Sequence, residues 1–315
     1  MKPAPLIAVV GPTAGGKSAL ALRLAQTCRG AIVNFDSIQL YRGFDIGAAK
    51  PSAAERAAAP HHLLDVLDPS ERTTAGDYAR RARPVLAEIA ARGNLPVLTG
   101  GTGFYLRALL DGLFPGARRD DALRQRLQAM AHRRGPGALH RLLRRLDPAR
   151  AEEVHPNDEP KVVRALEVCL LERRPMSSAF EQGGEALDSF EVLRLGLDPP
   201  REALYERIDR RTRAMFEGGL LEEVRALLAG GVAREAWPLS AIGYRQALAV
   251  VEGRLGTEDA IAETARATRN YAKRQLTWFR RQEPETRWMG GFGDDPPVER
   301  QALALAEAFL SRGRS

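Results

Sequence analysis

The sequence predicts an α/β protein whose core is a parallel sheet covered by helices, with an all-helical insertion. In the first third of the chain, short apolar strands alternate with helical segments, a pattern typical of a parallel sheet buried on both faces. From residue 115, Arg- and Leu-rich helical segments follow one another without a convincing strand. We therefore expect a core formed by residues 1–114 and 188–315, and a helical insertion formed by residues 115–187.

The amino-terminal part of the core begins with an apolar strand at Leu6–Val10. A glycine-rich loop follows this strand and opens a helix from about Lys17 to Cys28. A second apolar strand at Ala31–Phe35 ends at Asp36, which places an acidic side chain directly after a buried strand.

The rest of the core repeats this alternation. A helix capped by Thr74 precedes an apolar strand at Leu95–Thr99, after which the segment Gly100–Gly103 opens another helix. Beyond the insertion, Phe190–Leu197 returns to the strand pattern, and Pro200 suits the first turn of the helix that follows. Further helices are expected over residues 257–281 and 297–310.

Composition excludes several classes of protein. The chain has 315 residues, of which 44% are hydrophobic and 28% are charged, so it can form a sizeable core and is neither low-complexity nor globally disordered. Its apolar runs are shorter than the ~18–20 residues that cross a bilayer, and we expect no membrane segment. The two cysteines, Cys28 and Cys169, form neither a disulfide framework nor a zinc site, which favours a reducing cytoplasm.

The net charge of +7 makes a polyanionic partner plausible, and the excess of positive charge is uneven. Residues 116–174 contain 14 Lys or Arg against 9 Asp or Glu. Residues 264–282 contain six cations and no acid, and four of the cations share one helix face, namely Arg266, Arg269, Lys273 and Arg280. Such a face can simply be solvated or can bind phosphates, and the absence of acids favours phosphate binding.

An eight-residue motif after the first strand matches the phosphate-binding pattern G-x-x-x-x-G-K-[ST]. Because it lies between a strand and a helix, the core is expected to be a P-loop-type sheet. Backbone N–H groups and the helix N-terminus would face the anion, Lys17 would add a point charge, and Ser18 could ligate Mg²⁺. The motif consists of Gly11, Pro12, Thr13, Ala14, Gly15, Gly16, Lys17 and Ser18.

The motif alone does not determine the reaction. A nucleotide-hydrolysing enzyme would be expected to have a strand that ends in a magnesium-binding Asp, whereas the strand at 95–99 runs into Gly100-Gly101-Thr102. The acid at a clear strand end is Asp36, which would face the same crevice as the loop because ligands bind at the carboxyl ends of parallel strands. Asp36 could instead cap the next short helix, and small-molecule kinases can also carry an acid at this place.

Seven stretches of the sequence form an ordered and specific set. They are GPTAGGKS, DSIQLYRGFDIGAAKP, GGTGFYLRALLDGL, RALEV, REALYERIDRRTRAMFEGGLLEEV, IGYRQAL and TRNYAKRQLTWFRR. In this order they closely resemble the bacterial tRNA dimethylallyltransferase family along nearly the whole chain. The resemblance implies transfer of a dimethylallyl group from dimethylallyl diphosphate to the exocyclic amine of the adenosine 3′-adjacent to the anticodon, in tRNAs that read U-initial codons. The diphosphate would then occupy the loop, with Mg²⁺ as cofactor.

The resemblance also assigns roles to individual residues. Arg201, Arg207 and Arg211 would bind the leaving diphosphate, with Arg207 taking part in catalysis. Asp36 would be the general base for the adenine amine, and Thr102 matches a threonine near the reacting adenine. By sequence alone, the arginines could also form a solvated helix face, and Thr102 could be a helix cap.

The adenosine must leave the anticodon-loop stack to reach Asp36, and the resemblance implies a set of residues along the tRNA path. The basic insertion would clamp the anticodon stem through phosphates. Pro160-Lys161 departs from the Gln-Arg common in the family, and Ser240 stands where larger polar residues are common. The full set is Asp36, Ser37, Ile38, Gln39, Thr102, Arg124, Pro160, Lys161, Val162, Val163, Arg164, Ser240, Ala241, Ile242, Gly243, Tyr244, Arg245, Lys273, Arg274, Gln275, Leu276, Thr277, Trp278, Phe279 and Arg280.

Three other functions are compatible with parts of the sequence. A P-loop small-molecule kinase explains the loop and Asp36 but not the acid-free segment or the basic insertion. An adenylate isopentenyltransferase, which prenylates free AMP, does not need the insertion, and a non-catalytic RNA-binding regulator could use the loop as a sensor. We expect a cytoplasmic monomer without membrane contact, in which His61 and His62 are loop or substrate-edge residues rather than metal ligands.

Overall fold

The computed structural model of the chain divides into two compact units. The first is Met1–Leu109 together with Leu187–Ser315, and the second is Leu110–Ala186. The sequence predicts an insertion that begins at residue 115, whereas the second unit begins at Leu110 because the chain leaves the core directly after a helix that ends there. The residues described are 2–113, 119–135, 137–180 and 185–312.

The first unit is built around a six-stranded sheet in which all paired strands are parallel. The strands are β1 (Ala4–Val10), β2 (Gly30–Asn34), β3 (His61–His62), β4 (Leu95–Thr99), β5 (Phe190–Leu197) and β6 (Arg287–Met289). Their order across the sheet is β3-β2-β4-β1-β5-β6. This confirms the predicted α/β class with a parallel sheet at its centre.

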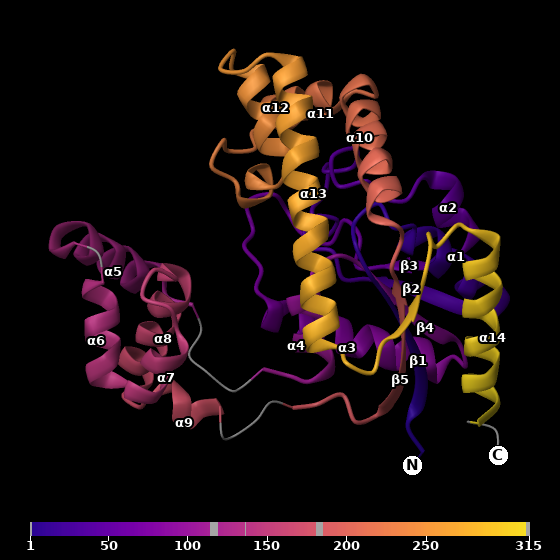
Figure 1. Cartoon of the computed structure of the whole chain (residues 1–315), viewed down its shortest axis with the longest axis horizontal. Coiled ribbons are helices and arrows are strands. Elements are labelled where there is room, and N and C mark those ends of the chain that lie inside the picture. The colour runs from indigo at the N-terminus through magenta and orange to yellow at the C-terminus, as the bar shows by residue number, and fades with distance from the viewer. Residues whose placement is uncertain (1, 114–118, 136, 181–184, 313–315) are drawn as a thin grey trace. The chain divides into compact units, whose positions relative to one another are not determined.

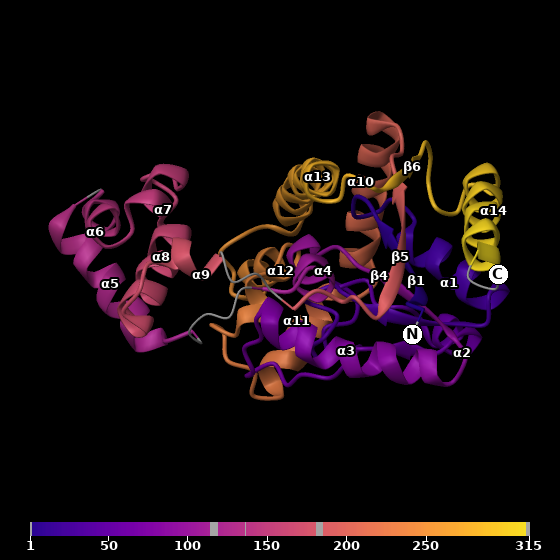
Figure 2. The same cartoon turned by 90° about the horizontal axis from the view of Figure 1, so that it is seen from below.

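Helices cover both faces of this sheet. The helices of the first unit are α1 (Lys17–Thr27), α2 (Ala53–Ala58), α3 (Ala75–Ala91), α4 (Gly103–Leu110), α10 (Arg201–Glu217), α11 (Leu220–Ala229), α12 (Tyr244–Val251), α13 (Thr257–Gln282) and α14 (Pro296–Arg312), with a 3-10 turn η1 (Trp237–Ser240). Figures 1 and 2 show the sheet between α1 and α14 on one side and α3 and α4 on the other. Leu20 and Leu24 of α1 join Ile7 and Val9 of β1 in one apolar cluster, which Ala302 of α14 completes. Burial on both faces explains why the strands are almost continuously apolar.

Two short strands escaped the sequence analysis. His61 and His62 form β3, which pairs with Ile32 and Val33 at the edge of β2, so they lie in a strand rather than in a loop. With two residues in β3 and three in β6, neither strand is long enough to show a period of two.

The topology brings three connecting segments to one edge of the sheet. The phosphate-loop motif Gly11–Ser18 follows β1, Asp36 follows β2, and Gly100–Thr102 follows β4. Because β4 lies between β1 and β2 and all three strands are parallel, these segments lie side by side. This is the edge at which parallel sheets bind ligands.

The second unit has its own apolar core and, among the residues described in it, contains helices and no strand, as predicted. Its helices are α5 (Asp121–Arg134), α6 (Ala138–Leu146), α7 (Pro148–Glu153), α8 (Glu159–Glu172) and α9 (Met176–Phe180). Leu127, Leu143 and Leu166 are buried in the centre, each from a different helix.

A buried carboxylate links α8 to α5 in this unit. Glu167 is fully buried and accepts hydrogen bonds from Arg124 at 2.9 Å, from Arg164 at 2.7 Å and from the backbone N–H of Asp120 at 2.7 Å. Burial by itself raises the pKa of Glu167, but these hydrogen bonds outweigh it and lower the pKa to about 2. The ionised carboxylate therefore stabilises the unit at neutral pH, and this contribution is lost as the pH falls from the ordinary value of 4.5 through about 2.

Replacing Glu167 with glutamine is expected to lower the stability of the second unit by about 3 kcal/mol, because the two arginines lose their charged partner in a partly buried site. Amide hydrogen exchange of α5 and α8 in the full chain measures this loss. Glu153→Gln is the matched control, since Glu153 pairs with Arg150 at the surface, where such pairs contribute about 0–1 kcal/mol. Equal amide exchange rates in Glu167→Gln and Glu153→Gln would contradict the stabilising role of Glu167.

Candidate functional site

The loop after β1 forms an anion cradle at the N-terminus of α1. Gly11 and Gly16 have φ values of +137° and +87°, a region that favours glycine. A Cβ at Gly16 would also lie 2.6 Å from the backbone nitrogen of Gly293, so this position has no room for a side chain. Lys17 begins α1 and donates to the carbonyl oxygen of Pro12 at 2.8 Å. These features are typical of a phosphate-binding loop.

The charge of this loop depends on what occupies it. Lys17 is buried, and burial lowers the pKa of its ammonium group to about 7; the Asp36 carboxylate opposes the shift, and Arg211 adds to it. A polyanion bound in the cradle would favour the protonated form again. The ammonium group is therefore only partly protonated near neutral pH until an anion arrives.

Asp36 is held rigidly at the end of β2. The Asn34 side chain accepts the N–H of Asp36 at 2.8 Å and donates to the Asp36 carbonyl at 3.1 Å. Oδ1 of Asp36 accepts the N–H of Ile38 at 2.9 Å, so this oxygen caps the following turn. The other oxygen, Oδ2, lies 3.2 Å from where a Cβ at Gly101 would be. The capping role therefore uses one carboxylate oxygen and leaves Oδ2 directed at the neighbouring loop.

The loop after β4 is tied to both sides of the site. Thr102 Oγ1 accepts the N–H of Ser37 at 3.0 Å, which joins this loop to the turn after Asp36. On the other side, the hydroxyl of Tyr271 in α13 donates to the Gly101 carbonyl at 3.0 Å. Thr102 and the turn after Asp36 are thus direct neighbours, a contact that the sequence did not indicate apart from the family resemblance of Thr102.

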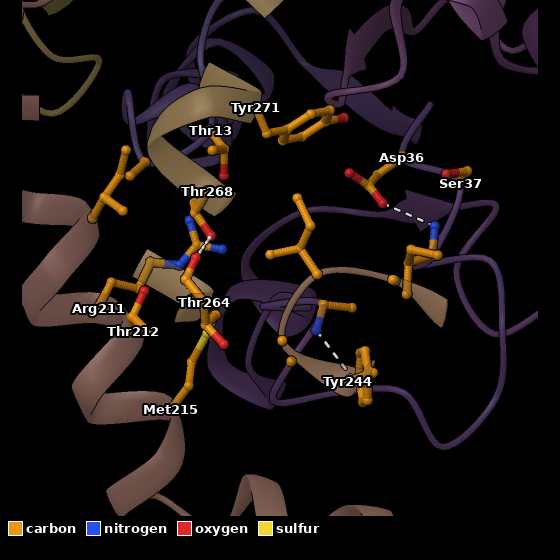
Figure 3. A pocket seen from close by; sticks show the side chains of 18 of the residues that line it. Thr13, Asp36, Ser37, Arg211, Thr212, Met215, Tyr244, Thr264, Thr268 and Tyr271 are labelled. Atoms are coloured by element: carbon orange, nitrogen blue, oxygen red, sulfur yellow. Dashed lines mark hydrogen bonds between the residues drawn. The ribbon is translucent and has the colours of Figure 1, made fainter. Parts of the chain in front are cut away.

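These loops open into a cavity of about 290 Å³. In Figure 3, Asp36 and Ser37 lie on one side of the cavity, and Arg211 and Met215 of α10 lie on the opposite side. Thr13 of the anion cradle also lines it. A carboxylate, an anion cradle and a cation therefore surround one space.

The cavity wall also contains Ile38 and residues 241–244, which were expected along the RNA path, but the contributions of α10 and α13 other than Arg211 were not anticipated from the sequence. Ile208, Thr212 and Met215 come from α10, whereas Thr264 and Thr268, together with Tyr271, come from α13. Within each helix these residues recur at spacings of three or four, which places them on one face. That periodicity was the available signal, but it does not reveal which buried face borders a cavity.

The three predicted arginines of α10 have different surroundings. Arg211 lines the cavity and has no ion-pair partner among the described residues; burial lowers the pKa of its guanidinium. Arg207 forms a two-pronged ion pair with Asp294, at 2.8 and 2.9 Å, over the ring of Phe292. Arg201 is exposed, contacts Tyr205 and does not line the cavity. Arg211 is therefore the arginine of this helix best placed for an anion in the cavity.

Asp294 is expected to compete with an anionic ligand for Arg207. Its carboxylate lies 2.6 Å from where a Cβ at Gly16 would be, and Arg207 lowers its pKa. Replacing Asp294 with asparagine should therefore tighten binding of inorganic diphosphate up to about fivefold, since exposed ion pairs contribute about 0.2–1 kcal/mol. Titration calorimetry measures the affinity. Glu258→Gln, which breaks a similarly exposed pair with Arg213 on the same helix, should leave it unchanged, and weaker binding to Asp294→Asn would contradict the expectation.

Residues of the first unit that were expected along an RNA path differ in exposure. Within the acid-free segment, Arg280 pairs with Asp198 at 2.6 Å, and Arg269 pairs with Asp209 at 2.6 Å. Ser240, Arg245, Lys273, Arg274, Thr277 and Arg280 are exposed; Ser37, Ile38, Gln39, Thr102, Ala241, Ile242, Leu276 and Trp278 are half-buried; Gly243, Tyr244, Gln275 and Phe279 are buried. The exposed and half-buried groups can contact a ligand. Of the buried ones, Gly243 and Tyr244 line the cavity, whereas Gln275 and Phe279 do not and support the site from behind.

The second unit contributes fewer accessible groups than expected. Val162 and Val163 belong to its apolar core, and Arg124 and Arg164 are bound to Glu167. Pro160 and Lys161 are exposed, with Lys161 paired to Asp158 at 2.6 Å. Six other arginines on α5 and α6 are exposed and have no acidic partner among the described residues: Arg126, Arg133, Arg134, Arg141, Arg144 and Arg145.

Neither a membrane span nor a metal cluster is found in the part of the chain described. None of its helices combines the length and apolarity needed to cross a bilayer. No three His, Cys, Asp or Glu side chains lie together in a way that could hold a metal ion.

Sequence comparisons agree on one group of proteins. The sequence model of the IPP transferase family matches residues 39–282, and that of the isopentenyl transferase family matches residues 4–66. The tRNA dimethylallyltransferase of Solibacter usitatus is 55% identical over 308 residues, which cover 98% of this chain and 100% of the relative. That of Koribacter versatilis is 53% identical over 300 residues, covering 95% and 97%.

Solved structures give the same result. The full-length tRNA isopentenylpyrophosphate transferase of Bacillus halodurans is 36% identical with a TM-score of 0.72, and 98% of each chain is covered. A eukaryotic dimethylallyltransferase acting on tRNA is 27% identical with a TM-score of 0.83, covering 98% of this chain and 80% of its own. The similarity therefore includes both units of the chain.

Proposed function

Since the chain belongs to the IPP transferase family and is a tRNA dimethylallyltransferase, we propose that its donor is dimethylallyl diphosphate, bound by the loop Gly11–Ser18. The acceptor is the exocyclic amine of the adenosine 3′-adjacent to the anticodon, in tRNAs that read U-initial codons. The single observation that carries this proposal is the cavity, whose lining includes both Thr13 of the anion cradle and Asp36.

The leaving group in this reaction is an anion, and the loop supplies charge to stabilise it. As the allylic carbon–oxygen bond breaks, negative charge grows on the diphosphate. Lys17 and N–H groups of the loop would stabilise this charge at the cradle, and Arg211 from the cavity wall, with Arg207 added once Asp294 is displaced. Preorganised donors of this kind commonly give the largest single contribution to catalysis.

The acceptor amine is a weak nucleophile, because its lone pair is delocalised into the adenine ring. Asp36 Oδ2 is free of the capping bond that occupies Oδ1 and would take the amine proton as the new carbon–nitrogen bond forms. The proton passes to Asp36 and the bonding electrons leave with the diphosphate, so the transfer balances without a phosphoryl step. Thr102, beside Asp36, would keep the adenine in place.

We propose Mg²⁺ as the cofactor, bound at Ser18. The Ser18 hydroxyl is exposed at the start of α1 and has no hydrogen-bond partner among the described residues. A single protein hydroxyl fits Mg²⁺, which keeps several waters and binds mainly to substrate phosphates. When bound, the ion would neutralise part of the charge on the diphosphate.

For the tRNA, the exposed cations fit a phosphate backbone. On α13, Arg266, Lys273, Arg274 and Arg281 have no acidic partner among the described residues, and they would follow the anticodon loop. The exposed arginines of α5 and α6 would contact stem phosphates, which position the RNA without reading its sequence. These contacts predict binding that weakens steeply as the salt concentration rises.

We further propose that the protein works as a monomer in the cytoplasm. The anion cradle and Asp36, which the proposed reaction needs, both belong to a single copy of the chain and border one cavity. Both cysteines are free, which suits a reducing compartment.

The direct test is mass analysis of tRNA nucleosides after incubation with dimethylallyl diphosphate. The expected result is the prenyl mass increment on the adenosine 3′-adjacent to the anticodon, and no increment in tRNAs that lack adenosine there. Transfer of label from ATP to a small molecule, without prenylation of RNA, would instead indicate a small-molecule kinase, which the relatives do not favour.

A further inference from the structure

Gln275 connects the two loops of the site from behind. It lies on α13, is only 4% exposed, and does not line the cavity. Its Oε1 accepts the backbone N–H of Thr13 in the anion cradle at 2.7 Å, and its Nε2 donates to the carbonyl of Gly101, next to Thr102, at 2.8 Å. One side-chain amide thus bridges the loop after β1 and the loop after β4.

The orientation of this amide is determined by its partners. Thr13 offers an N–H, so it must face the amide oxygen, and Gly101 offers a carbonyl, so it must face the NH₂ group. The Gly101 carbonyl also accepts the hydroxyl of Tyr271, one helical turn before Gln275, at 3.0 Å. Both lone pairs of that carbonyl are therefore used by α13.

The Gln275 amide is closely packed near Asp36, the proposed general base. A Cβ at Gly101 would lie 2.6 Å from Nε2 of Gln275 and 3.2 Å from Oδ2 of Asp36, so both groups face this glycine closely and position 101 has no room for a side chain. A shift of the Gln275 amide would move Gly101, and with it the surroundings of Asp36. The Thr13 N–H, in turn, is committed to Gln275 and is not available to a phosphate.

We propose that Gln275 is a positioning residue for prenyl transfer, which sets the distance between the diphosphate cradle and the Asp36 side of the cavity. This inference rests on the proposed function, because the two sides hold the two substrates. Reacting atoms must be about 3–3.5 Å apart for efficient transfer, and a misplacement of about 1 Å can cost about 100-fold in rate. Gln275 itself touches neither substrate.

Two variants test the role. Gln275→Met keeps the length and apolar volume of the side chain but removes both hydrogen bonds. Gln275→Glu keeps an acceptor for the Thr13 N–H, but when ionised it places a carboxylate oxygen against the Gly101 carbonyl. In both, we expect the single-turnover rate at saturating substrates to fall about 10- to 100-fold. The affinities for inorganic diphosphate and for an anticodon stem-loop RNA should change less than about threefold, because the groups that bind them are retained.

The pH dependence of Gln275→Glu provides a readout that a merely structural role would not show. A protonated glutamate has one donor and one acceptor and can restore both bonds, so the rate of this variant relative to wild type should rise as the pH is lowered. The ratio for Gln275→Met should stay constant. Asp36, Lys17, Tyr271 and Arg274 also carry titratable or charged groups on this side of the site, but they are common to all the proteins compared.

Gln282→Met is the matched control. Gln282 ends the same helix, is exposed, and accepts a hydrogen bond from Arg107 at 2.9 Å. The single-turnover rate of Gln282→Met should equal that of wild type. Wild-type rates in both Gln275 variants, a loss confined to substrate affinity, or a pH-independent ratio for Gln275→Glu would overturn the inference. Failure of the proposed function would be distinct, because wild type itself would then not prenylate the RNA.

Discussion

Replacing Asp36 with asparagine is expected to slow prenyl transfer by about 10²- to 10⁴-fold, the usual contribution of a general base. The asparagine Oδ1 can still accept the N–H of Ile38, and Asn34 still holds the backbone of residue 36, so the turn after β2 should persist. What is lost is the acceptor for the amine proton. Single-turnover prenylation of an anticodon stem-loop RNA, followed by nucleoside mass analysis, measures the rate.

The affinities separate a role in proton transfer from a role in binding. Binding of the RNA and of inorganic diphosphate should survive in Asp36→Asn, because the cradle and the exposed cations are untouched. Asp68→Asn is the matched control, since Asp68 likewise accepts a backbone N–H two residues on, from Ser70 at 3.0 Å, but in a surface turn. If Asp36→Asn retained more than about a tenth of the wild-type rate, a group other than Asp36 would have to accept the amine proton.

The parts of the site that are local in sequence could be predicted from it. The cradle Gly11–Ser18 requires a strand, glycines and a helix within one short segment, and Asp36 needs only a buried strand before it. Parallel pairing then brings the strand ends together without further information. The role of Thr102 came only from the family resemblance, and its place beside Asp36 depends on the pairing of β4 with β2, which the sequence did not reveal.

What depends on contacts between distant segments could not be predicted in this way. The acid-free stretch 264–282 suggested a row of free cations, yet Arg269 and Arg280 are paired with Asp209 and Asp198, which lie elsewhere in the chain. A window without acids does not imply surroundings without acids. Arg164 is a different case. Its partner Glu167 is three residues away on the same helix, and the sequence alone indicates that such a pair can form.

The burial of the predicted site residues also depends on contacts between distant segments. Gln275 and Trp278 stand in one run of polar and aromatic residues, but only the structure shows that the Gln275 amide turns inward and forms its hydrogen bonds with two loops. Sequence periodicity identifies a buried face without saying whether it meets apolar core, a cavity or a polar loop. That distinction separates the residues that can touch substrate from those that hold the site in place.

Replacing Lys17 with methionine is expected to lower kcat/KM for the donor by about 10²- to 10³-fold, comparable to the loss of one preorganised donor at a developing anion. It should also change how diphosphate binding depends on pH. In the free protein the pKa of Lys17 is about 7, so at pH 8 the ammonium is roughly nine-tenths deprotonated. A bound diphosphate raises that pKa, and binding should then take up about 0.9 proton at pH 8 but only about 0.1 at pH 6.

Calorimetric titration with inorganic diphosphate, repeated in buffers of different ionisation enthalpy, measures this uptake. Diphosphate itself titrates in the same range, but its contribution is present in wild type and in Lys17→Met alike, so the difference between them isolates Lys17. Lys2→Met, which alters an exposed lysine, controls for the loss of one cation. The difference should be an uptake that grows from pH 6 to pH 8. A difference that is absent, or that grows towards low pH, would mean that Lys17 stays protonated without a ligand and that the cradle is charged before the donor arrives.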